Sequence, residues 1–130
     1  MKRMILLAAL LAGCVETATA GDPSAAFNTG DWVLALVDGK VVDYQATINL
    51  GEKGKFSGQA PCNRYFGTLQ LESDKISLGP IGATKMMCLQ VNGEAEYFAL
   101  LQAVDRISAT EGEMMLTGAG HELRFIQPIP

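Results

Sequence analysis

The chain has 130 residues, 48% of them hydrophobic and 18% charged, and its 14 acidic side chains outnumber the 10 basic ones to give a net charge of −4. This length suits one folded domain with a single core. The acidic balance argues against a nucleic-acid-binding protein and against a polybasic membrane-surface protein, because both need a surplus of lysine and arginine.

The first 13 residues have the three parts of a bacterial lipoprotein signal peptide. Lys2 and Arg3 form the positive start, residues 4–11 form an apolar run, and Leu11-Ala12-Gly13-Cys14 ends that run as a lipobox. The run is roughly half as long as the ~20 apolar residues that cross a bilayer, so it is not a transmembrane helix. The sequence therefore predicts cleavage before Cys14 and lipidation of Cys14, and several acyl chains there would give a stable membrane anchor. The alternative is an ordinary secretory signal that ends at residues 17–20.

The residues after the lipobox predict a location and a tether. Residue 15 is Val and not Asp, which by the sorting rule of enteric bacteria indicates the outer membrane, with the domain facing the periplasm. After the cysteine, residues 14–30 are small and polar and have no apolar periodicity, so the lipidated Cys14 and a flexible tether are expected there. The folded domain is expected at residues 31–130.

Two cysteines remain once Cys14 is assigned to lipid. Cys62 and Cys88 are expected to form a disulfide, because the periplasm is oxidising. Closing that loop should stabilise the fold by roughly 3–4 kcal/mol. Two buried free thiols are the first alternative, and a redox or metal-binding pair is the second. The second is disfavoured because the chain has no Cys-x-x-Cys sequence and its single histidine, His121, lies far along the chain.

The domain has the pattern of a series of short strands that Gly-rich turns connect. Apolar residues alternate with polar ones at Ala46, Ile48 and Leu50, and again at Leu123 and Phe125, which predicts one buried face for each strand. The predicted strands comprise residues 32–37, 41–42, 45–50, 55–58, 65–71, 75–78, 113–117 and 121–126.

One segment, Glu94–Val104, has the spacing of an amphipathic helix instead. Asn92 is the predicted N-cap, and two acidic residues of the first turn, Glu94 and Glu96, favour the helix through its dipole. The apolar residues that recur at intervals of three and four are Tyr97, Leu100, Leu101 and Val104. The predicted fold class is mostly β with a minor α contribution: a small antiparallel barrel-like fold with one helix before the last hairpin.

The densest sequence signature lies in the middle of the domain. It joins Phe56-Ser57-Gly58 to the run Cys62-Asn63-Arg64-Tyr65-Phe66-Gly67, and Thr84-Lys85-Met86-Met87-Cys88 follows before the helix. Together with the opening tryptophan strand and the closing hairpin, this pattern resembles the META domain family of HslJ-like lipoproteins over Asp31–Phe125. The resemblance implies a compact barrel-like fold and an association with envelope stress, antibiotic tolerance and motility. It implies no catalytic residues.

The run Asn63-Arg64-Tyr65-Phe66 is the candidate binding surface, although a structural role is the stronger interpretation. Asn63 suits a tight corner, where it tolerates a left-handed conformation. Tyr65 and Phe66 point to opposite faces of a strand, so at least one of them is expected in the core. The predicted disulfide would hold the segment Thr84–Cys88 against this corner.

The sequence shows no set of a nucleophile, a base and an orienting group, so it predicts a protein that is not an enzyme. His121 lies beside Glu122 in a strand, where neighbouring side chains point to opposite faces. The late methionines are expected to fill gaps in the core, with one of each adjacent pair facing inward. A Cu(I) site of these methionines with Cys88 and His121 is the minor alternative, and no cofactor or metal is predicted. The methionines are Met86, Met87, Met114 and Met115.

These features predict a non-enzymatic envelope lipoprotein that acts in envelope maintenance or stress tolerance by binding a protein or a small ligand. Its expected partners are the membrane, through the N-terminal lipid, and an envelope protein, and not nucleic acid. The protein is expected to be a monomer. The alternative is an inhibitor of a hydrolase such as lysozyme or a protease, because a small disulfide-bonded barrel on a lipid anchor suits that task and an acidic surface suits a basic lysozyme.

Overall fold

The computed structural model of the chain describes residues 23–89 and 93–128. The predicted signal peptide at residues 1–13, Cys14 and the predicted N-cap Asn92 lie outside these ranges. Within them, no helix has both the length and the apolar character that a membrane span requires.

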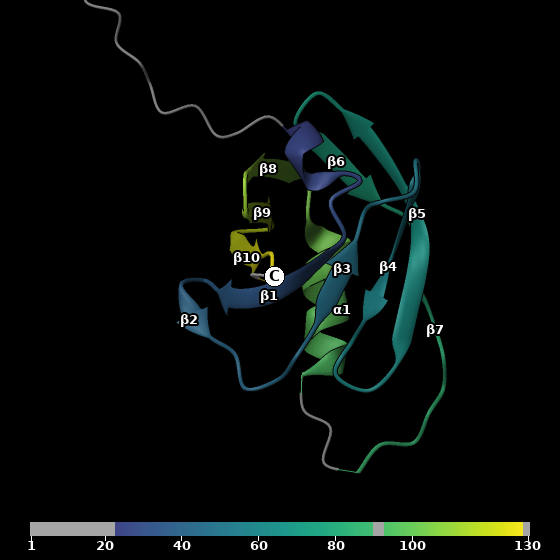
Figure 1. Ribbon diagram of the computed structural model, residues 1–130. Coiled ribbons are helices and arrows are strands. Elements are labelled where there is room, and N and C mark those ends of the chain that lie inside the picture. Colours follow the sequence, from purple (N-terminus) through teal and green to yellow (C-terminus); the bar gives the residue numbers. More distant parts are fainter. Residues whose placement is uncertain (1–22, 90–92, 129–130) are drawn as a thin grey trace, which may run out of the picture.

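The described residues form two helices and a sheet of short antiparallel strands (Figure 1). The helices are the 3-10 helix η1 (Pro23–Ala26) and the α-helix α1 (Glu94–Ala103). The strands are β1 (Asp31–Val37), β2 (Lys40–Val41), β3 (Thr47–Asn49), β4 (Lys55–Gln59), β5 (Arg64–Glu72), β6 (Lys75–Leu78), β7 (Gly82–Ala83), β8 (Arg106–Thr110), β9 (Glu113–Gly118) and β10 (His121–Ile126).

Eight of the strands in the described part of the chain close into a barrel. Around the barrel the order is β10-β9-β8-β6-β5-β4-β3-β1, and β1 then pairs with β10 to complete the ring. β2 pairs with β1, and β7 pairs with the start of β5 outside the ring. Closure leaves no open sheet edge along the ring, which removes a site for aggregation. The predicted mostly-β barrel with one helix before the last hairpin is confirmed.

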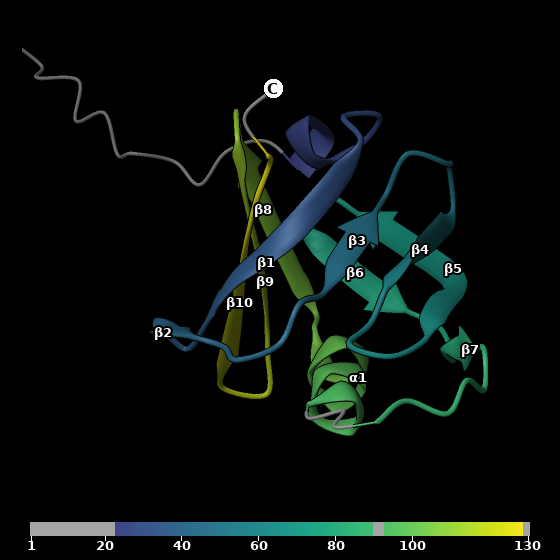
Figure 2. The same ribbon diagram turned by 60° about the horizontal axis from the view of Figure 1, so that its bottom comes forward.

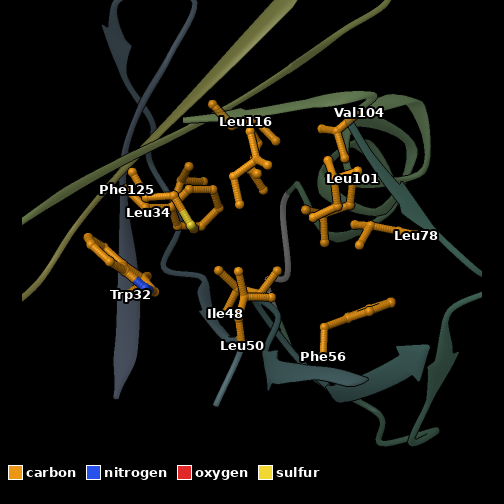
Figure 3. Close-up of a cluster of buried hydrophobic side chains, with 14 of the residues drawn as sticks. Trp32, Leu34, Ile48, Leu50, Phe56, Leu78, Leu101, Val104, Leu116 and Phe125 are labelled. Carbon is orange, nitrogen blue, oxygen red and sulfur yellow. The ribbon is translucent and has the colours of Figure 1, made fainter. Parts of the chain in front are cut away.

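Alternate residues of the barrel strands point inward and form one apolar core. The predicted inward residues Ala46, Ile48 and Leu50 are at most 1% exposed, and Leu123 and Phe125 are buried to the same degree. Figure 3 shows side chains of the helix in the same cluster as side chains of the strands. The helix and the barrel therefore share the burial of apolar area, which is the main favourable term in folding.

α1 closes one end of the barrel (Figure 2). The predicted helical face is confirmed, because Tyr97, Leu100 and Leu101 are buried, and Val104, the C-cap, is buried after them. The N-cap is Gly93, with φ of 92° and no side-chain cap hydrogen bond. Gly93 therefore occupies the N-cap position and has no side chain to cap the helix, while the predicted N-cap Asn92 lies outside the described residues.

η1 lies at the opposite end of the barrel and shortens the predicted tether (Figure 2). Ala26 is fully buried, and its carbonyl oxygen accepts a hydrogen bond of 3.0 Å from Trp32 Nε1. The expectation of a flexible tether through residue 30 is therefore corrected, since the folded domain begins before residue 31. Small residues without periodicity are typical of a tether, but here a small alanine is the residue that fits against the tryptophan.

β8 is the barrel strand that the sequence pattern did not predict. Its burial alternates, with Ile107 and Ala109 inside, but Ile107 is its only large apolar residue, so the apolar signal is weak. Its position depends on neighbours, because β8 pairs along its length with β9 and, at Arg106, with Lys75 of β6. β7 has two residues, which are too few to show a period.

Candidate functional site

The sequence signature folds into one corner of the molecule, beside the N-terminal end of α1. We call it the disulfide corner, and it comprises residues 60–66, the segment 82–89 and Glu94. A disulfide joins Cys62 to Cys88, with 5.9 Å between their Cα atoms, so the predicted pair is confirmed. It crosslinks the turn before β5 to the segment that follows β7, and neither sulfur is a free thiol.

Asn63 holds the segment after β7 from the inside. Its side chain is 8% exposed, and its Oδ1 accepts hydrogen bonds from the Met86 backbone N–H at 2.6 Å and from the Thr84 hydroxyl at 3.0 Å. The Thr84 backbone N–H donates to the Arg64 carbonyl oxygen at 3.0 Å. The segment therefore has a fixed backbone path in addition to the disulfide. Asn63 does not have the left-handed conformation that its residue type suggested.

Glu94 connects the first turn of α1 to the same corner. Its Oε1 accepts hydrogen bonds from the backbone N–H groups of Cys62 at 3.0 Å and Asn63 at 2.7 Å, and its Oε2 accepts one from Asn63 Nδ2 at 2.8 Å. Desolvation disfavours the charged carboxylate, but these three donors outweigh it, so the pKa of Glu94 lies below its ordinary value. The helix dipole does not explain this contact, which joins residues 31 apart and has no signal in the local sequence.

Two buried tyrosines join β5 to α1 behind the corner. The Tyr65 hydroxyl donates to the Thr47 carbonyl oxygen at 2.5 Å and lies 2.7 Å from the Tyr97 hydroxyl. The two tyrosine rings pack edge to face at 5.7 Å, and the Phe98 ring lies 5.5 Å from that of Tyr65. Burial raises the pKa of both tyrosines well above the ordinary value, so both hydroxyls stay protonated and act as structural hydrogen-bond partners.

The solvent-facing side of the disulfide corner is apolar. Met86, Met87 and Leu89 are 62%, 97% and 96% exposed, and Phe66 on the adjacent strand is 57% exposed. They follow one edge of the molecule, because β7 pairs with β5 at Phe66 and the segment then continues past the turn that contains Cys62. Single exposed apolar side chains are normal, but a run of large ones along one edge is a candidate interaction surface.

Two of the four residues of the predicted binding surface are not on the surface. Arg64 and Phe66 are exposed, whereas Asn63 and Tyr65 are buried. The strand alternation separates Tyr65 from Phe66 as expected, so one of that pair is in the core. Asn63 is inside because its amide satisfies buried backbone and carboxylate groups, and its part in the site is to position the exposed residues.

The methionines follow the predicted rule in one pair and not in the other. Met114 is fully buried on β9 and its neighbour Met115 is only partly buried, which fits one inward side chain per pair. Met86 and Met87 are both exposed, which corrects the expectation that they fill core gaps. Their segment is held outside the barrel by hydrogen bonds and the disulfide, so it has no inward face.

The polar residues singled out as metal ligands or catalysts are not brought together. His121 Nδ1 lies 2.7 Å from Asp38 Oδ2, and the Glu122 backbone N–H donates to Asp38 Oδ1 at 2.8 Å. The contact with His121 and then that with Glu122 hold the pKa of Asp38 below its ordinary value. Cys88 is in the disulfide, so the Cu(I) alternative lacks its thiolate. In residues 23–89 and 93–128 no cluster of three or more His, Cys, Asp or Glu side chains can hold a metal ion.

The chain is similar to solved structures over most of its length. An NMR structure of a protein from Burkholderia xenovorans is 26% identical, with a TM-score of 0.70, 88% of this chain covered and 93% of that chain covered. A second NMR structure is 25% identical, with a TM-score of 0.61; the match covers 80% of this chain and 92% of that chain. The crystal structure of a duf4847 family protein from Bacteroides vulgatus ATCC 8482 is 13% identical, with a TM-score of 0.63; the match covers 81% of this chain and 96% of that chain. At this identity the likeness shows the fold alone.

Comparison at the level of families gives a direct assignment. No curated protein matches the chain. The model of the META domain matches residues 25–128, which include η1 in part, the whole barrel, both cysteine segments and α1. The match begins before residue 31, in agreement with the buried position of Ala26. The chain therefore belongs to the META domain family.

Proposed function

We propose that this protein is a lipid-anchored component of the bacterial cell envelope, facing the periplasm from the outer membrane, and that it binds a protein partner there without catalysis. The lipobox that ends at Cys14 and the META domain, a family of envelope-associated proteins of unclear function, support the location. The pairing of the single histidine, His121, with a surface carboxylate instead of a hydroxyl or thiol supports a non-enzymatic role.

The observation that carries the proposal is an exposed apolar segment with a fixed backbone. The disulfide at Cys88 and the Asn63 hydrogen bonds hold residues 84–88, while Met87 is almost fully exposed. A segment that is ordered before binding loses less conformational entropy when a partner binds, so more of its contact energy appears as affinity. Methionine and aromatic side chains are enriched in protein interfaces relative to the rest of the surface.

The shape and charge of the corner favour a protein over a small molecule. A projecting segment needs a concave surface on its partner to bury Met87 and Leu89, and proteins provide such surfaces. The exposed charged residues of the disulfide corner, Arg64 and Lys85, are both basic, whereas the carboxylate of Glu94 is already hydrogen-bonded within the corner. We therefore propose a partner with an apolar pocket and an acidic rim, since opposite charges at the rim speed association and fix the orientation.

Complementation of a deletion strain tests this proposal. Loss of the protein should sensitise cells to envelope stress such as detergent, and the wild-type chain should restore growth. Met87→Asp should fail to restore it, because a charge at a 97% exposed position leaves the fold intact but prevents apolar contact. Val41→Asp, at an 83% exposed position on β2, is the matched control and should restore growth. Full restoration by Met87→Asp would contradict the proposal.

The anchor is tested separately. Cys14→Ala should abolish both the incorporation of labelled palmitate and the cleavage that shortens the chain, because lipidation and cleavage occur at the same cysteine. Mass spectrometry of the purified protein measures both. Palmitate incorporation that survives in Cys14→Ala would contradict a lipid anchor at this residue.

A protease inhibitor is the second candidate function, favoured by the same exposed segment with its disulfide. Asn63 fixes the backbone of this segment at Met86. A segment with a fixed backbone can occupy a protease cleft in the manner of a substrate and keep its conformation there, which favours tight binding. The lysozyme version is less favoured, since Arg64 and Lys85 would face a basic enzyme. Purified protein at micromolar excess should slow an envelope protease if this candidate is correct, and unchanged activity of such enzymes would eliminate it.

A further inference from the structure

The barrel surface is hollowed by a cleft at the end opposite the disulfide corner, beside η1. Its volume is about 460 Å³, which lies within the range of about 300–1,000 Å³ for small-molecule sites. Glycine backbone of the turn between β3 and β4 forms part of the floor. The side chains that line it are Phe27, Asn28, Leu50, Lys53, Leu69 and Leu71.

The walls of this cleft are apolar. Phe27 follows η1, Leu50 follows β3, and Leu69 and Leu71 lie on β5. Leu50 and Leu69 are buried, whereas Leu71 is 41% exposed at the outer edge. Because η1 has only four residues, it covers this end of the barrel in part and leaves Phe27 and Leu71 partly exposed at the cleft. An alkyl chain that covered them would remove apolar surface from water.

Among the described residues that line the cleft, Lys53 is the only charged one. In the described part of the chain its ammonium group has no ion-pair partner, since the neighbouring carboxylate of Glu52 lies 3.5 Å from Lys55 instead. The side-chain amide of Asn28, on the same rim, likewise has no hydrogen-bond partner within the described ranges. Two donors without partners beside an apolar wall suit the carboxylate of an apolar acid.

We propose that this cleft binds one free fatty acid, with its alkyl chain against Phe27 and Leu71 and its carboxylate at Lys53 and Asn28. The one ammonium group of Lys53 balances the charge of one carboxylate, whereas the chain as a whole has a net charge of −4. The volume lies toward the lower end of the range for ligand sites, which suits one alkyl chain better than the two chains of a phospholipid. This site is separate from the disulfide corner and does not depend on its function.

Photolabelling of the full-length chain tests the site. Membranes from cells that produce the protein are incubated with a medium-chain fatty acid that carries a diazirine and an alkyne, irradiated, and analysed by mass spectrometry. Isolated membranes without ATP or coenzyme A cannot transfer the probe to lipids or to Cys14. The label is expected on peptides that line the cleft, and excess decanoate should compete for it better than decanol. A label spread over the surface, or equal competition by decanol, would overturn the proposal.

Three variants locate the binding groups. Lys53→Gln should lower the labelling about threefold, because a contact between an ammonium and a carboxylate at an exposed site has a modest effect on affinity. Leu71→Asn should lower it further by making one wall polar. Lys55→Gln, which removes a cation that is already paired with Glu52, is the matched control and should label like the wild type. Equal labelling of Lys53→Gln and wild type, or competition by phosphatidylglycerol vesicles but not by decanoate, would overturn the fatty-acid assignment.

Discussion

The two ends of the barrel are closed in different ways. At the α1 end, a ten-residue helix packs into the core, Tyr65 and Tyr97 join it to β5, and the disulfide and the Glu94 carboxylate hold the neighbouring turn. At the η1 end, a four-residue 3-10 helix covers the opening; its one buried residue is Ala26, whose carbonyl oxygen accepts a hydrogen bond from Trp32 (Figure 2). We therefore expect the α1 end to be more stable than the η1 end.

This difference fits two kinds of binding. The α1 end supports an exposed apolar segment, which must keep its shape to act as an anchor for a protein partner. The η1 end is covered lightly and leaves a cleft between Phe27 and Leu71, which is the kind of space that a small apolar ligand fills. Changes at the α1 end should accordingly cost more stability than changes at the η1 end.

Removal of the disulfide should have the largest effect on stability. The double variant Cys62→Ser with Cys88→Ser should lower the free energy of unfolding by roughly 3–4 kcal/mol, because the unfolded chain regains the entropy of a loop that spans 26 residues. Urea denaturation of the double variant and of the oxidised wild type measures the difference. Coincident midpoints would show that the disulfide does not stabilise the α1 end.

Asn63→Ala should have the next largest effect, a loss of about 2–3 kcal/mol, because the part-buried hydrogen bonds that the Asn63 amide makes to Thr84, Met86 and Glu94 would all be lost. Asn49→Ala is the matched control, since that amide joins Asp31 and Gly51 at the surface, and it should cost only about 0.5–1 kcal/mol. Chemical denaturation compares the two variants. Equal losses would contradict a special role for the buried asparagine.

Glu94→Gln should lower stability by about 1–2 kcal/mol at neutral pH, because the amide keeps the shape but loses the charge that strengthens the bonds from Cys62 and Asn63. The pKa of Glu94 is lower in the folded protein than its ordinary 4.5, so this contribution is complete above about pH 4.5 and is lost as the pH falls through the folded-state pKa. Denaturation at pH 7 and pH 3 measures the change. If the difference in the free energy of unfolding between the wild type and Glu94→Gln were larger at pH 3 than at pH 7, this role of the Glu94 carboxylate would be contradicted.

Leu71→Asn should have the smallest effect, a loss of about 0.5 kcal/mol, because the side chain is 41% exposed at the edge of the η1 cleft. Thermal denaturation of the full chain is sufficient to detect it. A loss as large as that of Asn63→Ala would mean that the two ends of the barrel are equally integrated into the fold.

The elements of the fold could be predicted where the pattern is local. Alternation at Ile48 and Leu50 and helical spacing from Tyr97 to Val104 depend on neighbours within a few residues, and both were confirmed. β8 could not be predicted in this way, because its position comes from pairing with β9 more than from its own apolar residues. The early start of the domain depends on the contact of Ala26 with Trp32, which the composition of that segment conceals.

The candidate site could be predicted only in outline. The cysteine pair was expected and is present, but the inward direction of Asn63 and the outward direction of Met86 depend on a hydrogen bond between residues 23 apart. The contact of Glu94 with Asn63 spans 31 residues. The η1 cleft had no signal in the sequence, because Lys53 lies in a turn that has the residue types of any hairpin and its apolar neighbours come from three separate segments.

A photo-crosslinking amino acid, introduced into the full-length chain in living cells, tests the difference between the two ends most directly. One variant carries it at Lys85 in the disulfide corner, and the other carries it at Lys53 beside η1; both positions are exposed. We predict a discrete protein adduct from position 85, which the additional change Met87→Asp removes, and no protein adduct from position 53. The same protein adducts from both positions, or none from position 85, would contradict the claim that the α1 end is the protein-binding end.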